Sequence, residues 1–419
     1  MYKLEIIDRK TFDNFNSKNI AHFMQSSTFG DIKKEHGFIP MLTGLYKDKK
    51  LIATALVLKK KLKLGLSYFY IPRGYNLNYK NKEEIEEYTK EIKKMAKREK
   101  AVFVTIDPPI ELEKLDINGN VVEDLNHDFV DYLQSLGYKH KGYNYFFENR
   151  EPRYTFNLKL DKPYDEIIKN MHSTIRNIYN RGNPFNVIID KDKDDELKDF
   201  YFLMTETAKR QNIIPFTYKY YEKFYKLFKE NNNSDLYMVY VDIKNLKEIY
   251  KNKIDKIKSD IEKSEKKNKE GQVKELNNQL KKALKEQNEI KDMKDVVVPL
   301  SGYITVKYGD EVWVVHGGNA NYLRTIDAAY LAYFRMIKDA YDDGYKSIDF
   351  FGTIGKEDKK NPEYGIHLFK KRLGGDYIEF IGEFDLVINR PMHFIYNYLI
   401  PIYRKILKKK IGKELKDGA

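Results

Sequence analysis

Apolar runs and apolar residues at helical spacing follow a fixed order in the first half of the chain. LIATALVLKK and LGLSYFYI are two strand-like runs joined by a Lys-rich turn. Residues 83–99 carry apolar side chains on one helical face, namely Ile85, Tyr88, Ile92 and Met95. The apolar run AVFVTIDPP (residues 101–109) then reaches Asp107. These patterns predict a strand pair, a helix and a further strand that ends at an acidic residue.

The second half of the chain repeats this order. LSGYITVKY and EVWVVHG predict two strands joined by a turn at Gly309 and Asp310. Residues 325–343 have helical spacing, and YKSIDFFG is a short apolar strand that carries Asp349. Hairpin, helix, strand and acidic residue therefore occur twice, which predicts an internal duplication with a long period. Asp349 is the counterpart of Asp107 in this repeat.

A segment of different composition interrupts the second half. Residues 244–294 contain 16 Lys against 10 Asp and Glu, with one Gly and no Pro. Two sets of residues step along it by 4, 3, 4 and 3: Tyr250, Ile254, Ile257, Ile261 and Ser264, then Leu276, Leu280, Ala283, Gln287 and Ile290. Such heptad spacing predicts two helices packed side by side, with EKKNKEGQ as the turn between them. Each helix of about 20 residues would be about 30 Å long.

The charge of this hairpin leaves two interpretations open. Its excess of six positive charges is nearly half of the net charge of the protein, +13. The hairpin is then either a rigid strut with a solvated basic face or a basic arm that binds RNA or another polyanion.

We therefore predict three parts of the chain. A first unit takes residues 1–150, and a second unit takes residues 151–243 together with 295–396. Residues 244–294 form an antiparallel coiled-coil arm inserted into the second unit. The C-terminal residues 397–419 are expected to pack near the first unit.

Composition narrows the class of protein further. The 419 residues are 42% hydrophobic and 14% aromatic and include no Cys. These values exclude overall disorder, disulfides and Cys-based zinc sites. The N-terminal segment lacks the apolar core of a signal peptide, and no apolar run approaches the roughly 20 residues that span a bilayer. We expect a cytoplasmic protein, and its pI of about 9.1 favours a polyanionic partner.

The glycine-rich segment HGGNANYLR is not a known phosphate-binding loop. It lacks the spacing of a P-loop and of a dinucleotide-binding turn. DFFG, which follows later, has no kinase catalytic-loop motif before it. We expect Gly317 and Gly318 to end a strand, to allow close approach of backbone or ligand, and to lead into a helix.

Five segments together resemble a known family. They are FMQSSTFGDIKKEHGF near the N-terminus, RYTFNLKLDKPYDEIIKNMHSTIRNIYNRG, MTETAKRQNI, GGNANYLRTIDAAYLAYFRMIKDAYDDGYKSIDFFG and YGIHLFKKRLGGDYIEFIGEFDLVIN. They are similar to segments of the Fem family of peptidoglycan branching enzymes, and the similarity covers almost the whole chain. The resemblance implies an α+β fold of two tandem units like acyl-CoA N-acyltransferases (GNAT-like), with the helical hairpin inserted in the second.

The resemblance also implies an activity. Enzymes of this family take an amino acid from an aminoacyl-tRNA and attach it to the side-chain amine of a stem peptide, or to a bridge already begun there. The acceptor is a lipid-linked or UDP-linked muropeptide. We expect no metal and no cofactor beyond the aminoacyl-tRNA co-substrate, and a monomer or weak dimer.

This chemistry needs a base and a stabiliser of negative charge. The acceptor amine, with a pKa of about 10.4 if it is a lysine, must lose a proton before it attacks the ester. Attack creates an oxyanion. Lys370, at the Phe-Lys position of the resemblance, is the candidate for charge stabilisation. Asp107 is the candidate general base, and Asp349 has a similar claim. The alternatives are a solvated basic turn for Lys370 and a turn-forming Asp before proline for Asp107.

Further residues are candidates for substrate contacts. The resemblance places Lys33 and Arg210 at positions that contact the diphosphate of the acceptor, with Lys34 as the alternative to Lys33 if the register differs by one. Further candidate contacts with substrate are Phe369, Gly317, Gly318, Asn321 and Tyr322. Ordinary surface cations are the other interpretation of Lys33 and Arg210.

Two basic segments suggest further partners. Arg176 and Arg181 end a basic helix and are candidates for tRNA phosphates, or they neutralise a helix C-terminus. The tail IYRKILKKKIGKELK has spaced apolar residues among its lysines. It is either a solvated terminal helix or a peripheral contact with the anionic inner face of the membrane. The eight His residues show no metal-ligand spacing.

The sequence departs from the family pattern at a few positions. Phe29 stands where Trp or Tyr is common, Leu373 where Phe is usual, and Ile213 and Ile214 where an aromatic residue occurs. Two other functions remain as alternatives. One is a CoA-dependent N-acyltransferase, although neither PRGYN nor HGGNAN supplies its phosphate loop. The other is a non-catalytic protein that binds tRNA or other nucleic acids.

Overall fold

The computed structural model describes residues 1–419 except 20–21, 148–149, 194, 212 and 400–419. The chain divides into two compact units. The first comprises Met1–Phe156, Gly352–Asp358 and the chain from Asp376 onward, and the second comprises Asn157–Phe351 and Lys359–Gly375. Within the described residues, no helix is long and apolar enough to cross a membrane.

A seven-stranded sheet forms the centre of the first unit, in the order β1-β2-β3-β4-β5-β16-β8. Its strands are β1 (Tyr2–Ile6), β2 (Phe38–Lys47), β3 (Lys50–Lys61), β4 (Ser67–Ile71), β5 (Ala101–Ile106), β8 (Tyr138–His140) and β16 (Phe384–Val387). β4 and β5 are parallel, and the other neighbours are antiparallel. Outside this seven-stranded sheet, β15 (Asp376–Phe380), β6 (Glu111–Leu115) and β7 (Val121–Asp124) are neighbours in that order and antiparallel.

Helices cover this sheet through their apolar faces. They are α1 (Arg9–Asn16), α2 (Ser27–Lys34), α3 (Lys82–Arg98), α4 (His127–Ser135) and α13 (Arg390–Phe394), with short turns η1 (Phe23–Gln25), η2 (Lys63–Gly65) and η4 (Ile395–Leu399). Asn81 caps α3 by accepting the N–H of Glu84 at 3.4 Å. The predicted apolar face of α3 packs into the core of the unit, with Tyr88 fully buried.

The C-terminal strand of the chain belongs to the first unit, which corrects the predicted boundary. The sequence pattern assigned residues up to 396 to the second unit. In the structure, β16 pairs with β5 on one side and with β8 on the other. Asp385 on β16 also accepts a hydrogen bond from the Thr105 hydroxyl at 2.7 Å. Of the predicted tail 397–419, only residues 397–399 are described, and the Lys139 ammonium donates to the Tyr398 hydroxyl at 2.7 Å.

The second unit contains five neighbouring strands, in the order β10-β11-β12-β13-β14. They are β10 (Ile188–Lys191), β11 (Ser234–Asp242), β12 (Val297–Tyr308), β13 (Glu311–Asn319) and β14 (Ser347–Thr353). β9 (Tyr154–Lys159) carries the chain into this unit. The helices are α5 (Tyr164–Asn170), α6 (Ser173–Arg181), α7 (Glu196–Gln211), α8 (Tyr218–Lys229), α11 (Ala328–Asp342) and α12 (Tyr364–Leu373), with the short turn η3 (Arg324–Ile326).

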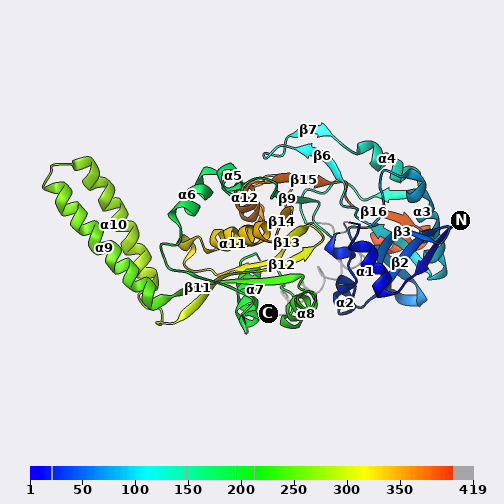
Figure 1. The fold of residues 1–419 in the computed structure, drawn as a ribbon, viewed down its shortest axis with the longest axis horizontal. Helices are drawn as coiled ribbons and strands as arrows, with labels where there is room; N and C mark the ends of the chain where they lie inside the picture. The colour runs from blue at the N-terminus through cyan, green and yellow to red at the C-terminus, as the bar shows by residue number, and fades with distance from the viewer. Residues whose placement is uncertain (20–21, 148–149, 194, 212, 400–419) are drawn as a thin grey trace, which may run out of the picture. The chain divides into compact units, whose positions relative to one another are not determined.

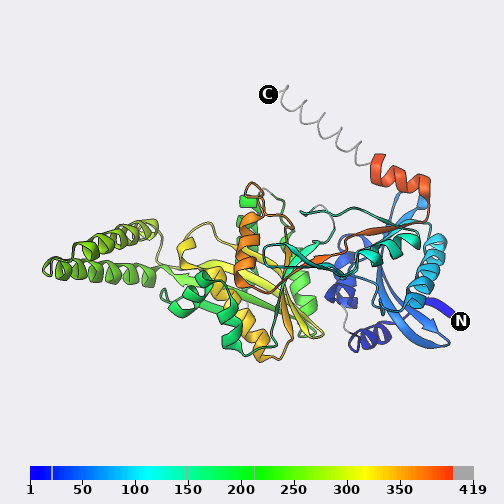
Figure 2. The same cartoon turned by 90° about the horizontal axis from the view of Figure 1, so that it is seen from above.

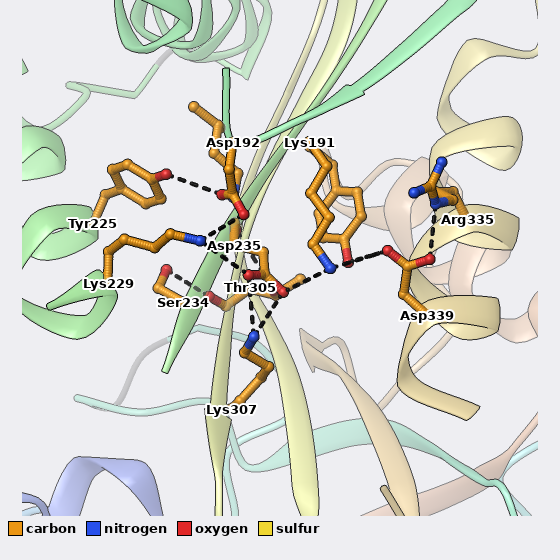
Figure 3. A network of polar contacts seen from close by, with 12 residues as sticks. Lys191, Asp192, Tyr225, Lys229, Ser234, Asp235, Thr305, Lys307, Arg335 and Asp339 are labelled. Carbon is orange, nitrogen blue, oxygen red and sulfur yellow. Dashed lines mark hydrogen bonds and ion pairs between the residues drawn. The ribbon is translucent and has the colours of Figure 1, made fainter. Parts of the chain in front are cut away.

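A network of charges connects β11 to helices on both of its faces (Figure 3). The buried carboxylate of Asp235 on β11 lies 3.0 Å from Lys307 and 3.4 Å from Lys229 of α8. Lys191 bridges Asp235, at 3.2 Å, to Asp339 of α11, at 3.1 Å. Burial disfavours the charge of Asp235, but Lys307 and Lys191 hold its pKa below the usual value. This pairing compensates a buried charge and ties α8 and α11 to the sheet.

The predicted duplication is confirmed in the order of the elements. In the first unit the antiparallel pair β3–β4 leads to α3 and then to β5, which is parallel to β4. In the second unit β12–β13 leads to α11 and then to β14, which is parallel to β13. The structure is thus an α+β fold of two units that share one order of elements. Asp107 follows the last residue of β5, whereas Asp349 is the third residue of β14, so the two carboxylates occupy different places along their strands.

The helix predicted over residues 325–343 begins at Ala328. Leu323 and Asp327 adopt left-handed backbone conformations, with φ of 52° and 58°. An α-helix cannot pass through such residues, so α11 begins directly after Asp327.

The inserted hairpin consists of α9 (Ile243–Glu265) and α10 (Glu270–Ile290), which lie side by side in Figures 1 and 2. All five residues of α9 that the heptad spacing predicted to face the other helix are buried. On α10, Ala283 is buried and Leu276 and Leu280 pack against the same cluster. The heptad spacing predicted that Gln287 faces α9, but Gln287 is only partly buried and the preceding residue, Glu286, is buried in its place. The Glu286 carboxylate lies 3.5 Å from Lys253, which explains how the hairpin accommodates an acid there.

Candidate functional site

Asp107 is a buried carboxylate at the end of β5. Pro108 follows it, so the chain leaves the sheet there. Its Oδ1 accepts the backbone N–H of Arg73 at 2.7 Å, and its Oδ2 accepts the Tyr70 hydroxyl at 3.0 Å. Burial raises the pKa of Asp107 to about 7, although Arg73 acts to lower it. A carboxyl with this pKa can exchange a proton near neutral pH.

Charged side chains surround Asp107 within the first unit. Burial raises the pKa of Glu151, while Lys33 and Arg73 act to lower it. Burial also raises the pKa of Tyr70, and the charges of Asp107 and Glu151 act in the same direction. The guanidinium of Arg150 lies over the ring of Tyr70 at 4.9 Å. The arrangement concentrates ionisable groups of both signs where β4 and β5 end.

Lys33, rather than Lys34, belongs to this cluster. Both end α2, but the Lys34 ammonium pairs with Asp31 at 2.7 Å on the surface. Lys33 is half-buried, with its ammonium over the ring of Phe29 at 4.7 Å. Burial lowers the pKa of Lys33, while Glu151 and Asp107 act to raise it. The first of the two predicted registers therefore places a lysine with the candidate base.

Lys370, the candidate for charge stabilisation, is buried in the second unit. It lies on α12 with 4% of its surface exposed, so it is not part of a solvated basic turn. Its ammonium donates to the carbonyl of Phe351 at 2.9 Å. Burial lowers the pKa of Lys370 to about 8, and Asp349 and Glu363 act to raise it. The amine is therefore mostly protonated at neutral pH and lies in a low-dielectric environment.

The carbonyl that binds Lys370 belongs to a residue in an unusual conformation. Phe351 has φ of 62°, in the left-handed region, inside strand β14. A non-glycine residue there costs roughly 1–2 kcal/mol. The Asp349 carboxylate accepts the N–H of Phe351 at 2.6 Å, and Lys370 binds its C=O. The two charged side chains thus hold opposite ends of one strained residue, which we call the Phe351 clamp.

Glu311 lies on the same face of the sheet as Asp349. It starts β13, where its Cα pairs with Ser347, two residues before Asp349. Its carboxylate accepts hydrogen bonds from the Ser347 hydroxyl, at 2.9 Å, and from the Asn157 amide. Burial and then the charge of Asp349 raise the pKa of Glu311 to about 7.

Arg210 forms a polar cluster with Asn321 at the end of α7. The guanidinium donates to the Asn321 side-chain oxygen at 2.5 Å and to the Asn319 carbonyl at 3.3 Å. The Asn321 amide in turn donates to Glu206 at 2.8 Å. Burial, and the nearby Arg324, lower the pKa of Arg210. Two of the predicted substrate-contact residues are thus brought together in the second unit.

Other predicted contacts have packing partners. Tyr322 donates its hydroxyl to the Pro299 carbonyl at 2.7 Å. The ring of Phe369 stacks on Tyr330 at 4.5 Å and meets Tyr333 edge-on at 4.9 Å. For these two residues the structure provides a packing role, and substrate binding stays a prediction.

The two glycines of β13 permit close packing of protein against protein. A Cβ on Gly318 would lie 2.7 Å from backbone atoms of Leu203 and Met204 in α7. One on Gly317 would lie 2.6 Å from the ring of Tyr303. The predicted close approach therefore exists, but it is made by α7 and Tyr303. The glycines do not lead directly into a helix, since α11 begins only at Ala328.

The candidate tRNA contacts have partners inside the protein. Arg176 donates to the carbonyls of Lys169 and Met171, both at 3.0 Å, and so caps the end of α5. Arg181 forms an ion pair with Asp327 at 2.6 Å. Arg181 remains exposed, and binding of tRNA by either residue stays a prediction.

Sequence reasoning missed several residues that surround the candidates. Arg73 was visible only as part of PRG, and Glu151, Tyr70 and Glu311 carried no motif. Their places depend on strand pairings between distant segments, so no local pattern identifies them. The one available signal was the acidic residue in the repeated strand, which pointed to Asp349.

Comparison with known proteins establishes the relationships of the chain. A model of the FemAB family matches residues 7–400. The chain belongs to the FemAB family. The resemblance seen in the sequence is thereby confirmed.

FemAB relatives align over nearly their whole length. The chain is 27% identical over 410 residues to a lipid II:glycine glycyltransferase of Staphylococcus haemolyticus (strain JCSC1435), covering 94% of each protein. It is 27% identical over 438 residues to the enzyme of the same name from Staphylococcus aureus (strain USA300), covering 99% of this chain and 100% of the other. The crystal structure of FemX superposes with a TM-score of 0.74 at 25% identity, covering 94% and 99% of the two chains.

The packing role of Gly318 predicts a cost in stability. Gly318→Ala should lower the free energy of unfolding by about 1–3 kcal/mol, because the new methyl group overlaps the backbone of α7. Gly271→Ala is the matched control, since Gly271 lies in α10 with open space around it and Ala favours a helix by up to about 1 kcal/mol. Urea unfolding measures both. Unchanged stability with weakened substrate binding in Gly318→Ala would instead favour a substrate contact.

Proposed function

We propose that this protein transfers an aminoacyl group from aminoacyl-tRNA to an amine of the peptide of a lipid-linked peptidoglycan precursor. The observation that carries the proposal is the family match over residues 7–400, with relatives named lipid II:glycine glycyltransferases aligned from end to end. Their names make glycine the first amino acid to test and lipid II the first acceptor. The dependence on tRNA is part of the proposal.

The reaction forms an amide and breaks an ester. The acceptor amine, once deprotonated, attacks the ester carbonyl, and the carbonyl oxygen takes up negative charge. When the tetrahedral intermediate collapses, the C–O bond to the terminal ribose breaks and the ribose hydroxyl leaves with a proton. The ester is already activated, so this exchange needs no nucleotide triphosphate.

In this scheme Lys370 stabilises the developing oxyanion. Its ammonium is buried and protonated near neutral pH, so it acts with little screening by water. Asp349 is a positioning residue, because it holds the N–H of Phe351 whose C=O binds Lys370. Lys370 therefore keeps one position relative to the strand, as electrostatic preorganisation requires.

Asp107 accepts the proton of the acceptor amine. Its pKa of about 7 makes it a stronger base than an ordinary aspartate while leaving part of it ionised at neutral pH. Its hydrogen bonds from Arg73 and Tyr70 fix the carboxylate at the end of β5.

A transfer assay tests the proposal together with Lys370. The purified protein is incubated with lipid II and glycyl-tRNA, and the acceptor is examined by mass spectrometry. We expect a gain of one glycyl residue or more, with kcat lowered about 100-fold or more in Lys370→Ala. Lys371→Ala should stay within about threefold of wild type, because the adjacent Lys371 is only partly buried and water screens its charge.

The same assay separates the alternatives. Other charged tRNAs and UDP-linked acceptors identify a different donor or acceptor. Absence of a product with every pair, despite tRNA binding, would favour a nucleic-acid-binding protein. Transfer from an acyl-CoA in place of the aminoacyl-tRNA would favour the CoA-dependent enzyme.

The pKa of Asp107 predicts the pH dependence of the reaction. A base must be deprotonated to act, so kcat/KM should rise tenfold per pH unit below about pH 7 and level off above it. In Asp107→Asn, kcat/KM should fall at least about 100-fold, and its rise with pH, the acidic limb of the profile, should disappear. Tyr70→Phe, which removes one hydrogen bond to the carboxylate, should shift the limb to higher pH. An unchanged limb in Asp107→Asn would assign the base to another group.

A further inference from the structure

A cavity of about 460 Å³ lies in the first unit beside the last described residues of the chain. Lys93 of α3, Lys139 of β8 and Arg390 of α13 line it, together with His393, Phe394 and Tyr398. The three cations come from separate elements of the chain. All of them belong to one unit, so the cavity is complete within it.

Internal hydrogen bonds orient two of these cations. The ammonium of Lys93 donates to the Leu136 carbonyl at 3.0 Å. That of Lys139 donates to the Tyr398 hydroxyl at 2.7 Å and lies over its ring at 5.0 Å. Both partners are neutral, so they direct the side chains without cancelling their charge.

The cavity is therefore electropositive. None of the described lining residues is acidic. The buried carboxylate of Asp385 contacts one lining residue, since it lies 2.9 Å from His393 Nε2. The same carboxylate accepts a hydrogen bond from the Thr105 hydroxyl. Burial and the charge of Lys97 lower the pKa of Lys93, in agreement with an excess of positive charge here. Such a cavity favours an anion able to contact several cations, as a phosphate does.

Apolar side chains border the same cavity. The lining residues Phe394 and Tyr398 have 54% and 42% of their surface exposed. The rings of Phe394 and Tyr398 stack on each other at 5.4 Å. Aromatic rings beside lysines and arginines are typical of surfaces that enter the headgroup region of a bilayer, where one side is apolar and the other wet.

The sequence continues this chemistry beyond the described residues. Residues 400–419 contain seven Lys or Arg against two acidic residues, with apolar residues at Ile402, Ile406, Leu407 and Ile411. Clusters of basic residues are attracted to anionic lipids by about 1 kcal/mol per residue. Charged and apolar residues thus alternate in the stretch of sequence that follows Leu399.

We propose that this cavity binds the phosphate of an anionic phospholipid and docks the first unit on an anionic membrane surface. Phe394 and Tyr398 enter the headgroup region, while Lys139 and Arg390 contact the phosphate. The inference deepens the proposed function, since a lipid-linked acceptor resides at such a surface, but docking itself requires no catalysis.

Vesicle sedimentation with the full chain tests this docking. We expect binding to vesicles of phosphatidylcholine with phosphatidylglycerol, none to phosphatidylcholine alone, and weaker binding at high salt. Lys139→Glu with Arg390→Glu should weaken binding about thirtyfold or more. The control, Lys256→Glu with Lys258→Glu, makes the same charge change on the exposed face of α9 and should stay within about twofold.

Two further measurements distinguish a lipid phosphate from a soluble phosphate, and membrane docking from aminoacyl transfer. Inorganic phosphate added without vesicles should leave the melting temperature of the protein unchanged. A melting temperature that rises with phosphate in wild type but not in the Lys139 and Arg390 variant, together with no binding of wild type to vesicles, would indicate a soluble ligand. Transfer to a water-soluble acceptor should persist in that variant, so loss of docking and loss of transfer are separable. Equal weakening in both charge-reversed variants, or equal binding to neutral vesicles, would overturn the docking site.

Discussion

The proposed chemistry of the second unit depends on how a lysine is held inside the protein. Lys370 is buried, and its ammonium donates to the carbonyl of Phe351, a residue in a left-handed conformation. That conformation persists because Asp349 binds the N–H of the same residue. A strained peptide, a buried carboxylate and a buried ammonium are each unfavourable alone. Together they compensate one another and give a cation with one orientation.

The architecture around this clamp follows from a duplicated pattern. β13 and β14 run parallel and bring Glu311, Ser347 and Asp349 to one face of the sheet, while α12 brings Lys370 to the Phe351 carbonyl of β14. In the first unit, the parallel strands β4 and β5 place Tyr70, Arg73 and Asp107 together in the same way. Each unit thus holds ionisable groups away from water beside a parallel pair of strands, after the end of β5 in the first unit and near the start of β13 and β14 in the second.

Periodicity predicted much of this fold. The repeated order of elements, the helix α3 and the two helices of the inserted hairpin follow from apolar spacing alone, since local burial determines that spacing. The strand β16 could not be assigned to the first unit, because its pairing with β5 joins residues about 280 positions apart. The start of α11 was also misplaced, since nothing in Leu323 or Asp327 signals a left-handed backbone. Among the candidate site residues, Lys370 was found through the family resemblance and Asp107 through its place at the end of an apolar strand. Glu151, Glu311 and Phe351 became visible only in three dimensions.

A double-mutant cycle on the Phe351 clamp tests the central claim most directly. It compares kcat/KM for glycyl transfer in wild type, Asp349→Asn, Lys370→Ala and the double variant. If Asp349 acts through the position of Lys370, its substitution should lower the rate about tenfold or more in wild type and have little further effect once Lys370 is absent. If the two substitutions instead lower kcat/KM independently, so that their effects multiply in the double variant, the clamp is contradicted. Lys370 would then have no defined position in the mechanism.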